Sequence, residues 1–182
     1  PGFGVIILII DVSEILNEVG STKVFSGSFL PDDIIFQGEE IKFLEPFSIN
    51  GTVMNSKGGI LLVQATVKGH CILQCGACME PYSQSIGFSF TVEFRTSGSD
   101  PDIYIYTGNS IDLRDAIMDY FLLELPTRRR CREDCKGLCP KCGVNLNHNQ
   151  CTCKEEEKEQ EEYIDSRLAV LKDFFSSSDK EV

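Results

Sequence analysis

The chain has 182 residues, of which 42% are hydrophobic, and its formal net charge at pH 7 is −11. This length and apolar content are enough for a buried core, so we expect a globular protein with one main domain. The acidic balance argues against a protein that covers nucleic-acid phosphates over a broad surface, because that affinity comes mainly from lysine and arginine.

The first apolar run, Val5–Ile10, is predicted to be a buried strand. It is far shorter than the roughly 20 residues that a membrane-spanning helix needs. It also lacks the basic start of a secretory signal. We therefore expect a cytoplasmic protein with no membrane partner.

The middle of the chain has the alternating apolar and polar pattern of an antiparallel meander. The alternating segments are 47–53, 61–73 and 86–94. The apolar face of the second segment includes Cys71, which we expect to be a packed core cysteine, whereas His70 falls on the polar face. Cys75 and Cys78 then lie at the connection between two long strands.

A helix is predicted after the last strand. Ser110 or Asp112 can cap it, and Pro126 stops it. Its apolar positions have helical spacing and are Leu113, Ile117, Tyr120 and Phe121. We therefore expect a helix that ends before the cysteine-rich segment.

Between residues 131 and 153 the sequence reads CREDCKGLCPKCGVNLNHNQCTC, which contains six cysteines. Its CPKCG stretch has the form of a zinc knuckle, and the CTC stretch returns two more sulfurs after eight intervening residues. Four thiolates fill a tetrahedral Zn²⁺ and leave no open position, so the pattern predicts one structural zinc. The expected ligands are Cys139, Cys142, Cys151 and Cys153.

Six cysteines are more than one zinc ion uses, so alternative ligands remain. Cys135 is the first alternate, Cys131 is the second, and His148 could replace one sulfur. A different hypothesis joins two distant pairs into a split site, Cys139 and Cys142 with Cys75 and Cys78. A disulfide framework is a third hypothesis, but the nine cysteines are odd in number and it would need an oxidising compartment.

The expected fold class is α+β, an antiparallel β-sheet meander with a few helices and a C-terminal zinc-knuckle module. Residues 1–126 form the predicted core domain and residues 127–153 the cysteine-rich zinc module. Residues 154–182 are predicted to be a charged linker, followed by a short helix at about 166–175 and a tail.

The charges are unevenly distributed. Residues 1–126 carry 6 basic and 16 acidic side chains, whereas residues 127–153 carry 6 basic and 2 acidic ones. The possible RNA contacts are therefore Arg128, Arg129, Arg130, Arg132, Lys136 and Lys141. Four thiolates with one Zn²⁺ carry a net charge of −2, so these cations could equally serve to offset that charge.

Several segments together resemble the YceD family of large ribosomal RNA subunit accumulation proteins. They are CGACMEP after a long strand, LELP at the end of the helix, CREDCKGLCPKCGVNLN with its CTC return, and DSRLAVL. The resemblance implies a bacterial cytosolic protein, with plastid relatives, that supports accumulation of large-subunit ribosomal RNA. Ala77 departs from the family, which often has arginine there, and some members lack the terminal cysteine cluster.

Two functions follow as hypotheses. The first is a non-catalytic factor in ribosome biogenesis that binds large-subunit ribosomal RNA, or whose acidic body shields a basic ribosomal protein. The alternative is a thiol-disulfide oxidoreductase that uses Cys75 and Cys78. Against the enzyme, that pair leads directly into a strand, whereas a redox pair usually opens a helix. We expect no small-molecule substrate.

Overall fold

The computed structural model describes residues 8–98 and 103–153. The chain divides into two compact units, residues 1–150 and residues 151–182. Every described helix and strand belongs to the first unit. They are β1 (Ile9–Asp11), β2 (Thr22–Phe29), β3 (Ile34–Phe36), β4 (Glu39–Ile41), β5 (Phe47–Asn55), β6 (Leu61–Gln74), β7 (Pro81–Arg95), β8 (Tyr104–Ile105), β9 (Ser110–Asp112) and α1 (Arg114–Glu124).

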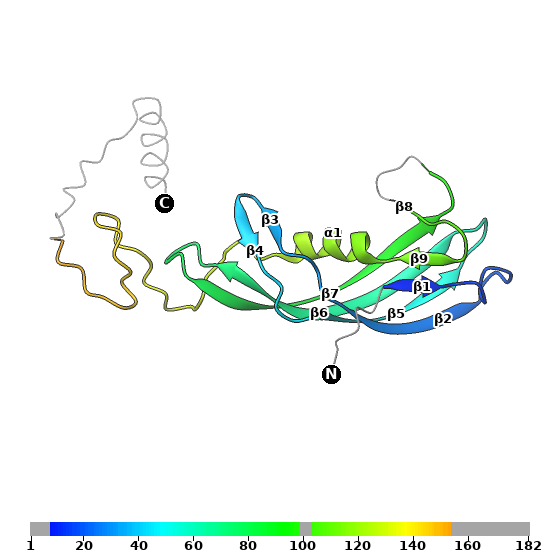
Figure 1. Ribbon diagram of the computed structural model, residues 1–182, viewed down its shortest axis with the longest axis horizontal. Helices are drawn as coiled ribbons and strands as arrows, with labels where there is room; N and C mark the ends of the chain where they lie inside the picture. The colour runs from blue at the N-terminus through cyan, green and yellow to red at the C-terminus, as the bar shows by residue number, and fades with distance from the viewer. Residues whose placement is uncertain (1–7, 99–102, 154–182) are drawn as a thin grey trace, which may run out of the picture. The chain divides into compact units, whose positions relative to one another are not determined.

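The centre of the first unit is a five-stranded sheet with the order β2-β5-β6-β7-β8. Its strands are antiparallel neighbours, except that β7 and β8 run parallel. Two small antiparallel pairs, β1 with β9 and β3 with β4, complete the described strands. Figure 1 shows α1 and the β3–β4 pair on the same side of the long sheet.

The alternating segments of the sequence lie within β5, β6 and β7. Strands β6 and β7 are paired along their full facing length, from Leu61 opposite Phe94 to Gln74 opposite Pro81. Every second side chain points into the core, because successive residues of a strand face opposite sides. The buried side chains of β7 are Ile86, Phe88, Phe90, Val92 and Phe94. Cys71 of β6 is also buried, as its position in the pattern predicts.

Helix α1 covers the inner face of the sheet. Three aromatic rings join it to the sheet and to the segment after β4, with ring centroids 5.2 Å apart for Phe43 and Phe121 and 5.7 Å apart for Phe47 and Phe121. Phe121 and Phe47 are fully buried. The helix therefore stabilises the fold through packing of aromatic side chains against the sheet.

The start of α1 differs from the sequence prediction. Ser110 and Asp112 belong to β9, and the N-cap is Leu113, which makes no side-chain capping bond. Asp112 still accepts a hydrogen bond from the backbone N–H of Arg114 at 3.0 Å. The described residues are mostly strands with this single α-helix, in place of the few helices that were expected.

Several predictions for the ends of the chain concern residues that lie outside the described ranges. In the predicted strand Val5–Ile10, residues 5–7 lie outside the described residues, and β1 begins at Ile9. The charged linker and the short helix predicted within 154–182 also lie outside them. Among the described residues, no helix combines the length and apolar character needed to cross a membrane.

Candidate metal centre

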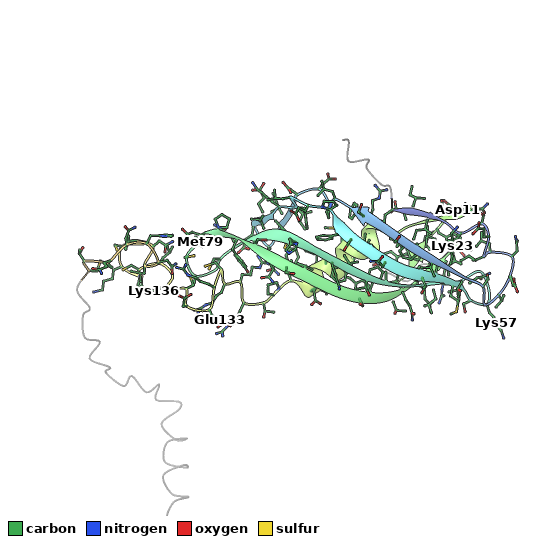
Figure 2. The ribbon with its side chains drawn as sticks, turned by 90° about the horizontal axis from the view of Figure 1, so that it is seen from below. Asp11, Lys23, Lys57, Met79, Glu133 and Lys136 are labelled. Carbon is green, nitrogen blue, oxygen red and sulfur yellow. The ribbon has the colours of Figure 1, made fainter. Side chains whose placement is uncertain are left out.

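The turn between β6 and β7 carries the first two cysteines of interest. Cys75 donates its backbone N–H to the carbonyl of Glu80 at 2.9 Å, and Met79 donates to the carbonyl of Cys75 at 2.8 Å. Met79 adopts a left-handed conformation with φ of 63°. Figure 2 shows Met79 at the end of the sheet opposite Lys57, which lies in the β5–β6 turn. This tight turn brings Cys75 and Cys78 to one end of the sheet.

The segment after α1 returns to this turn. The backbone N–H of Gly76 donates to the carbonyl of Arg129 at 2.9 Å, and that of Leu138 donates to the carbonyl of Ala77 at 2.9 Å. Gly137 has φ of +73°, and a Cβ there would lie 3.0 Å from the oxygen of Ala77. Glycine at residue 137 therefore permits the close approach of the two backbones.

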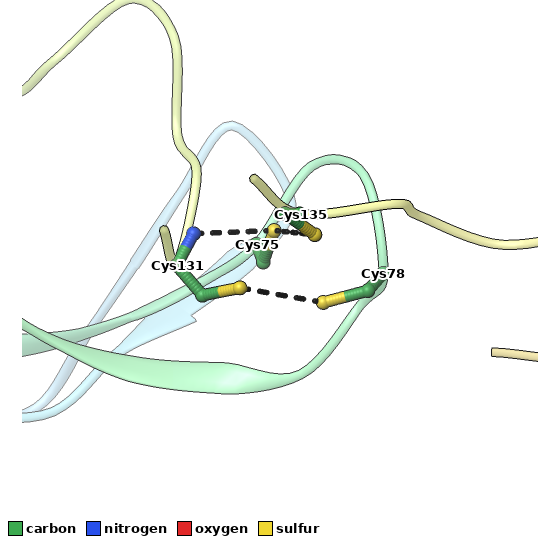
Figure 3. A group of neighbouring side chains, drawn as sticks. All are labelled: Cys75, Cys78, Cys131 and Cys135. Carbon is green, nitrogen blue, oxygen red and sulfur yellow. Dashed lines mark hydrogen bonds between the residues drawn. The ribbon is translucent and has the colours of Figure 1, made fainter. Parts of the chain in front are cut away.

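Four cysteine sulfurs meet where these segments touch. The Sγ atoms of Cys75 and Cys135 are 3.9 Å apart, and those of Cys78 and Cys131 are 3.7 Å apart. All four lie within 4.8 Å of one another. Figure 3 shows the two sulfurs of the turn facing the two from the returning segment. We call Cys75, Cys78, Cys131 and Cys135 the turn cluster.

The turn cluster has the dimensions of a tetrathiolate metal site. In a tetrahedron with metal–sulfur bonds of about 2.3 Å, neighbouring sulfurs are about 3.8 Å apart. A disulfide would need sulfurs about 2.05 Å apart, and these four cysteines form none. Cys75, Cys78 and Cys135 are buried, and Cys131 is half-buried. The cluster is therefore a closed site.

Hydrogen bonds bias the four thiols toward different protonation states. Burial by itself raises the pKa of Cys75, but backbone N–H groups around its sulfur lower that pKa to about 6. A backbone hydrogen bond lowers the pKa of Cys78, but burial and the neighbouring sulfurs raise it to about 12. The pKa of Cys135 is lowered, first by the side chain of Asn147, and that of Cys131 is raised, first by burial. Four thiolates this close repel one another unless they share a cation.

Two side-chain contacts hold the returning segment against the core. Arg129, whose side chain is 13% exposed, forms an ion pair with Glu39. His148 Nε2 lies 2.7 Å from Glu80 Oε1 in the β6–β7 turn. The sequence hypothesis that His148 replaces a sulfur ligand therefore competes with this carboxylate contact.

The CPKCG segment, which is the predicted zinc knuckle, forms a tight turn. Cys139 donates its N–H to the carbonyl of Val144 at 2.8 Å, and Gly143 donates to the carbonyl of Cys139 at 2.9 Å. Gly143 has φ of 73°, a conformation that favours glycine. Glycine at residue 143 therefore permits the tight turn that begins at Cys139.

Within the first compact unit, the turn cluster is a group of four cysteines that could hold a metal ion. The four ligands predicted from the sequence, Cys139, Cys142, Cys151 and Cys153, divide between the two units. Cys139 and Cys142 belong to the first compact unit, and Cys151 and Cys153 begin the second. Within the second unit, the backbone N–H of Cys153 lies 3.2 Å from Cys151 Sγ.

Sequence reasoning missed the composition of the turn cluster. It treated Cys131 and Cys135 as alternates for the module's zinc and proposed a split site that joined Cys75 and Cys78 to Cys139 and Cys142. The structure instead brings Cys131 and Cys135 to the β6–β7 turn. A usable signal was present, because eight of the nine cysteines occur as four closely spaced pairs, which is the number that two tetrathiolate sites require.

The basic residues singled out as RNA contacts do not share one environment. Arg129 is largely buried in its ion pair with Glu39. Arg132 forms an exposed ion pair with Asp134 at 3.4 Å. The exposed members of the set are Arg128, Arg130, Arg132, Lys136 and Lys141.

Residues 63–175 match the protein family described as large ribosomal RNA subunit accumulation protein YceD. An uncharacterised protein of Mycobacterium tuberculosis is 33% identical over 118 residues, which is 61% of this chain and 54% of that relative. The YCED homolog 1 of Arabidopsis thaliana, a chloroplastic large ribosomal RNA subunit accumulation protein, is 44% identical over 50 residues, 28% of this chain and 16% of that protein. The chain thus spans about half the length of the mycobacterial relatives. No solved structure matches it.

Proposed function

The chain belongs to the YceD family, and we propose that it is a non-catalytic cytoplasmic factor that supports accumulation of large-subunit ribosomal RNA. The observation that carries this proposal is the family match over residues 63–175. That range includes most of β6, all of β7 and α1, and the eight paired cysteines. The matched part of the chain is therefore the part that carries all eight paired cysteines.

We further propose that the four cysteines of the sequence prediction bind one structural Zn²⁺. Their spacing supports this, because Cys142 and Cys151 are separated by only eight residues and a tetrathiolate site tolerates such a loop. The knuckle turn at Cys139–Gly143 gives independent local support. This zinc would order the chain between the two pairs without taking part in a reaction.

Ribosomal RNA is the partner that the basic residues of the module favour. Arg128 and Arg130 are exposed and lie in a segment with six basic and two acidic side chains. Arginine and lysine gain affinity for RNA by displacing counterions from phosphates. The rest of the chain is acidic and would repel phosphates, so we expect the RNA to contact only this module. A basic ribosomal protein that docks on the acidic body is the second candidate partner.

The oxidoreductase alternative has weak support. A redox thiol must be reached by its substrate, but Cys75 is 0% exposed and Cys78 is 3% exposed. Both lie in a strand-to-strand turn, so no helix N-terminus stabilises a thiolate. Each also faces a sulfur from residues 131–135, which is the arrangement of a metal site.

Depletion of the protein tests the proposed role. We expect the ratio of mature large-subunit to small-subunit ribosomal RNA to fall in depleted cells, while transcription of the ribosomal RNA operon stays unchanged. Wild-type protein should restore the ratio. An unchanged ratio after depletion would remove the ribosomal role.

Paired variants separate the two partners. Arg128→Ala with Arg130→Ala should weaken binding of large-subunit RNA and flatten its salt dependence, because two phosphate contacts are lost. Arg129 is left unchanged, since its ion pair with Glu39 gives it a structural role. If the partner is a basic protein, the RNA-binding assay will show no difference, and Glu45→Lys on the exposed acidic surface will weaken the protein complex instead.

A further inference from the structure

We propose that the turn cluster binds a second structural Zn²⁺, which fastens the segment after α1 to the β6–β7 turn. The ligands are Cys75, Cys78, Cys131 and Cys135. The sequence pattern predicts only one zinc ion, which is bound within residues 139–153. The inference concerns metal content and local structure, so it does not depend on the ribosomal role.

The geometry of the sulfurs supports a single tetrahedral ion. The sulfur separations of 3.9 Å and 3.7 Å bracket the value of about 3.8 Å for a zinc tetrathiolate. Each separation joins one sulfur of the β6–β7 turn to one sulfur of the returning segment. All four sulfurs lie within 4.8 Å of one another, so one ion could bind them all.

The donors around the sulfurs are those of a metal knuckle. The backbone N–H of Cys131 lies 3.4 Å from Cys75 Sγ, and Asn147 Nδ2 lies 3.4 Å from Cys135 Sγ. A zinc ion with four thiolates keeps a net charge of −2, which N–H donors to sulfur help to stabilise. Neutral thiols would gain little from such donors, because a thiol is a weak acceptor.

All-cysteine coordination is typical of a structural zinc site. Soft thiolates favour zinc or iron over magnesium and calcium, and four sulfurs leave no position for water. Three of the four cysteines are buried, with exposures of 0% for Cys75, 3% for Cys78 and 6% for Cys135. The ion would therefore be structural.

The ion would join parts of the chain that are distant in sequence. Residues 78 and 131 are separated by the whole of β7, β8, β9 and α1. The two segments are also joined by the hydrogen bonds of Gly76 with Arg129 and of Leu138 with Ala77. Side-chain contacts of Arg129 with Glu39 and of His148 with Glu80 add to them. A metal that closes such a long loop removes much conformational freedom from the unfolded chain. We infer that it is the main fastening of residues 129–138 to the sheet.

Metal analysis of the full chain tests the inference. Protein purified without chelator should contain about two zinc ions per chain. Cys75→Ser and Cys131→Ser should each lose one ion, and the double variant should also lose only one, because both residues belong to the same site. Cys139→Ser should lose a different ion, so its combination with Cys75→Ser should leave none. Cys71→Ala is the control, since this buried cysteine belongs to neither group, and it should keep both ions.

Two further measurements guard against a variant that merely misfolds. Cys135→His should keep the ion that Cys135→Ser loses, because three cysteines and one histidine also hold zinc. In hydrogen exchange, the amides of Gly76 and Leu138 should lose protection in Cys131→Ser while those of β5 and β6 keep theirs. Cobalt substitution should give the absorption of tetrahedral thiolate coordination with an intensity that halves in Cys75→Ser. A wild type that contains only one zinc ion and keeps it in Cys75→Ser, or iron in place of zinc at the turn cluster, would overturn the inference.

Discussion

The ring of Phe47 occupies the space beside Gly69 on the neighbouring strand. A Cβ at Gly69 would lie 2.0 Å from Cδ1 of that ring, far inside any permitted contact. Phe47 is fully buried and packs on Phe43 and Phe121, so its ring has no free space into which it could move. Glycine at residue 69 is thus required by the aromatic cluster under α1.

Gly69→Ala should destabilise the protein. We expect a loss of about 1–3 kcal/mol in the free energy of unfolding, the usual cost of overpacking a core. Chemical denaturation measures it. Gly87→Ala is the matched control on β7, because a Cβ there meets its nearest atoms at 4.0 Å. Equal effects of the two substitutions would contradict the packing argument.

Asn55→Ala should destabilise the packing of the segment between β1 and β2. Asn55 is 3% exposed, and its Nδ2 donates to the carbonyls of Ile15, Leu16 and Glu18 at 2.7, 3.0 and 3.1 Å. Its removal breaks three hydrogen bonds of a buried side chain, at a cost of about 1–3 kcal/mol. Thermal unfolding should show the loss, whereas Asn50→Ala, at an exposed position of β5, should leave the midpoint unchanged.

Asn147→Ala should weaken the metal of the turn cluster without removing a ligand. Asn147 donates to Cys135 Sγ at 3.4 Å and accepts from the backbone N–H of Lys136 at 2.9 Å. Groups that orient metal ligands typically change metal affinity by about 10–100-fold. Competition with a chromogenic chelator measures the change. Asn149→Ala, at an exposed position two residues away, should show wild-type affinity.

The ion pair before α1 should contribute to stability only above acidic pH. The hydrogen bond from Arg114 is the main reason that the pKa of Asp112 lies below 3.8. Because the pKa is depressed in the folded state, the stabilisation is complete above 3.8 and is lost as the pH falls through the folded value. The pair is partly exposed, so its contribution is limited to about 1 kcal/mol.

Unfolding of the wild type and of Asp112→Asn, measured from pH 7 to pH 2, checks this expectation. The wild type should be the more stable of the two at pH 7, and the difference should shrink below pH 3.8. Arg114→Gln should remove most of the same difference. If the stability difference between the wild type and Asp112→Asn stays constant down to pH 2, the charge of Asp112 does not contribute to stability.

Sequence periodicity predicted the long strands well, because one face of the sheet is buried and the other is not. Phe88, Phe90 and Val92 alternate with polar residues, and they lie in β7 as expected. The start of α1 was predicted less well. Asp112 is a good helix-capping residue, but β1 supplies a strand partner for β9, and this long-range pairing outweighs the local preference.

The ligand sets were harder to predict for a physical reason. Spacing alone identifies sulfurs that share a turn, such as Cys75 and Cys78. It does not reveal which distant pair will meet them, since that depends on the path of β7, β9 and α1. The backbone hydrogen bonds of Gly76 and Leu138, which direct the returning segment to the β6–β7 turn, leave no pattern in the residue types.

The pairing of β1 with β9 constrains how the chain can fold during synthesis. Ile9 lies opposite Asp112, so the first described strand must wait for about 100 further residues before its partner exists. At roughly 5–20 residues per second, that wait is on the order of 5–20 s. During this interval β1 lacks β9, the strand with which it pairs. Strand β1 can therefore pair only after β2, β5, β6 and β7 have all been synthesised.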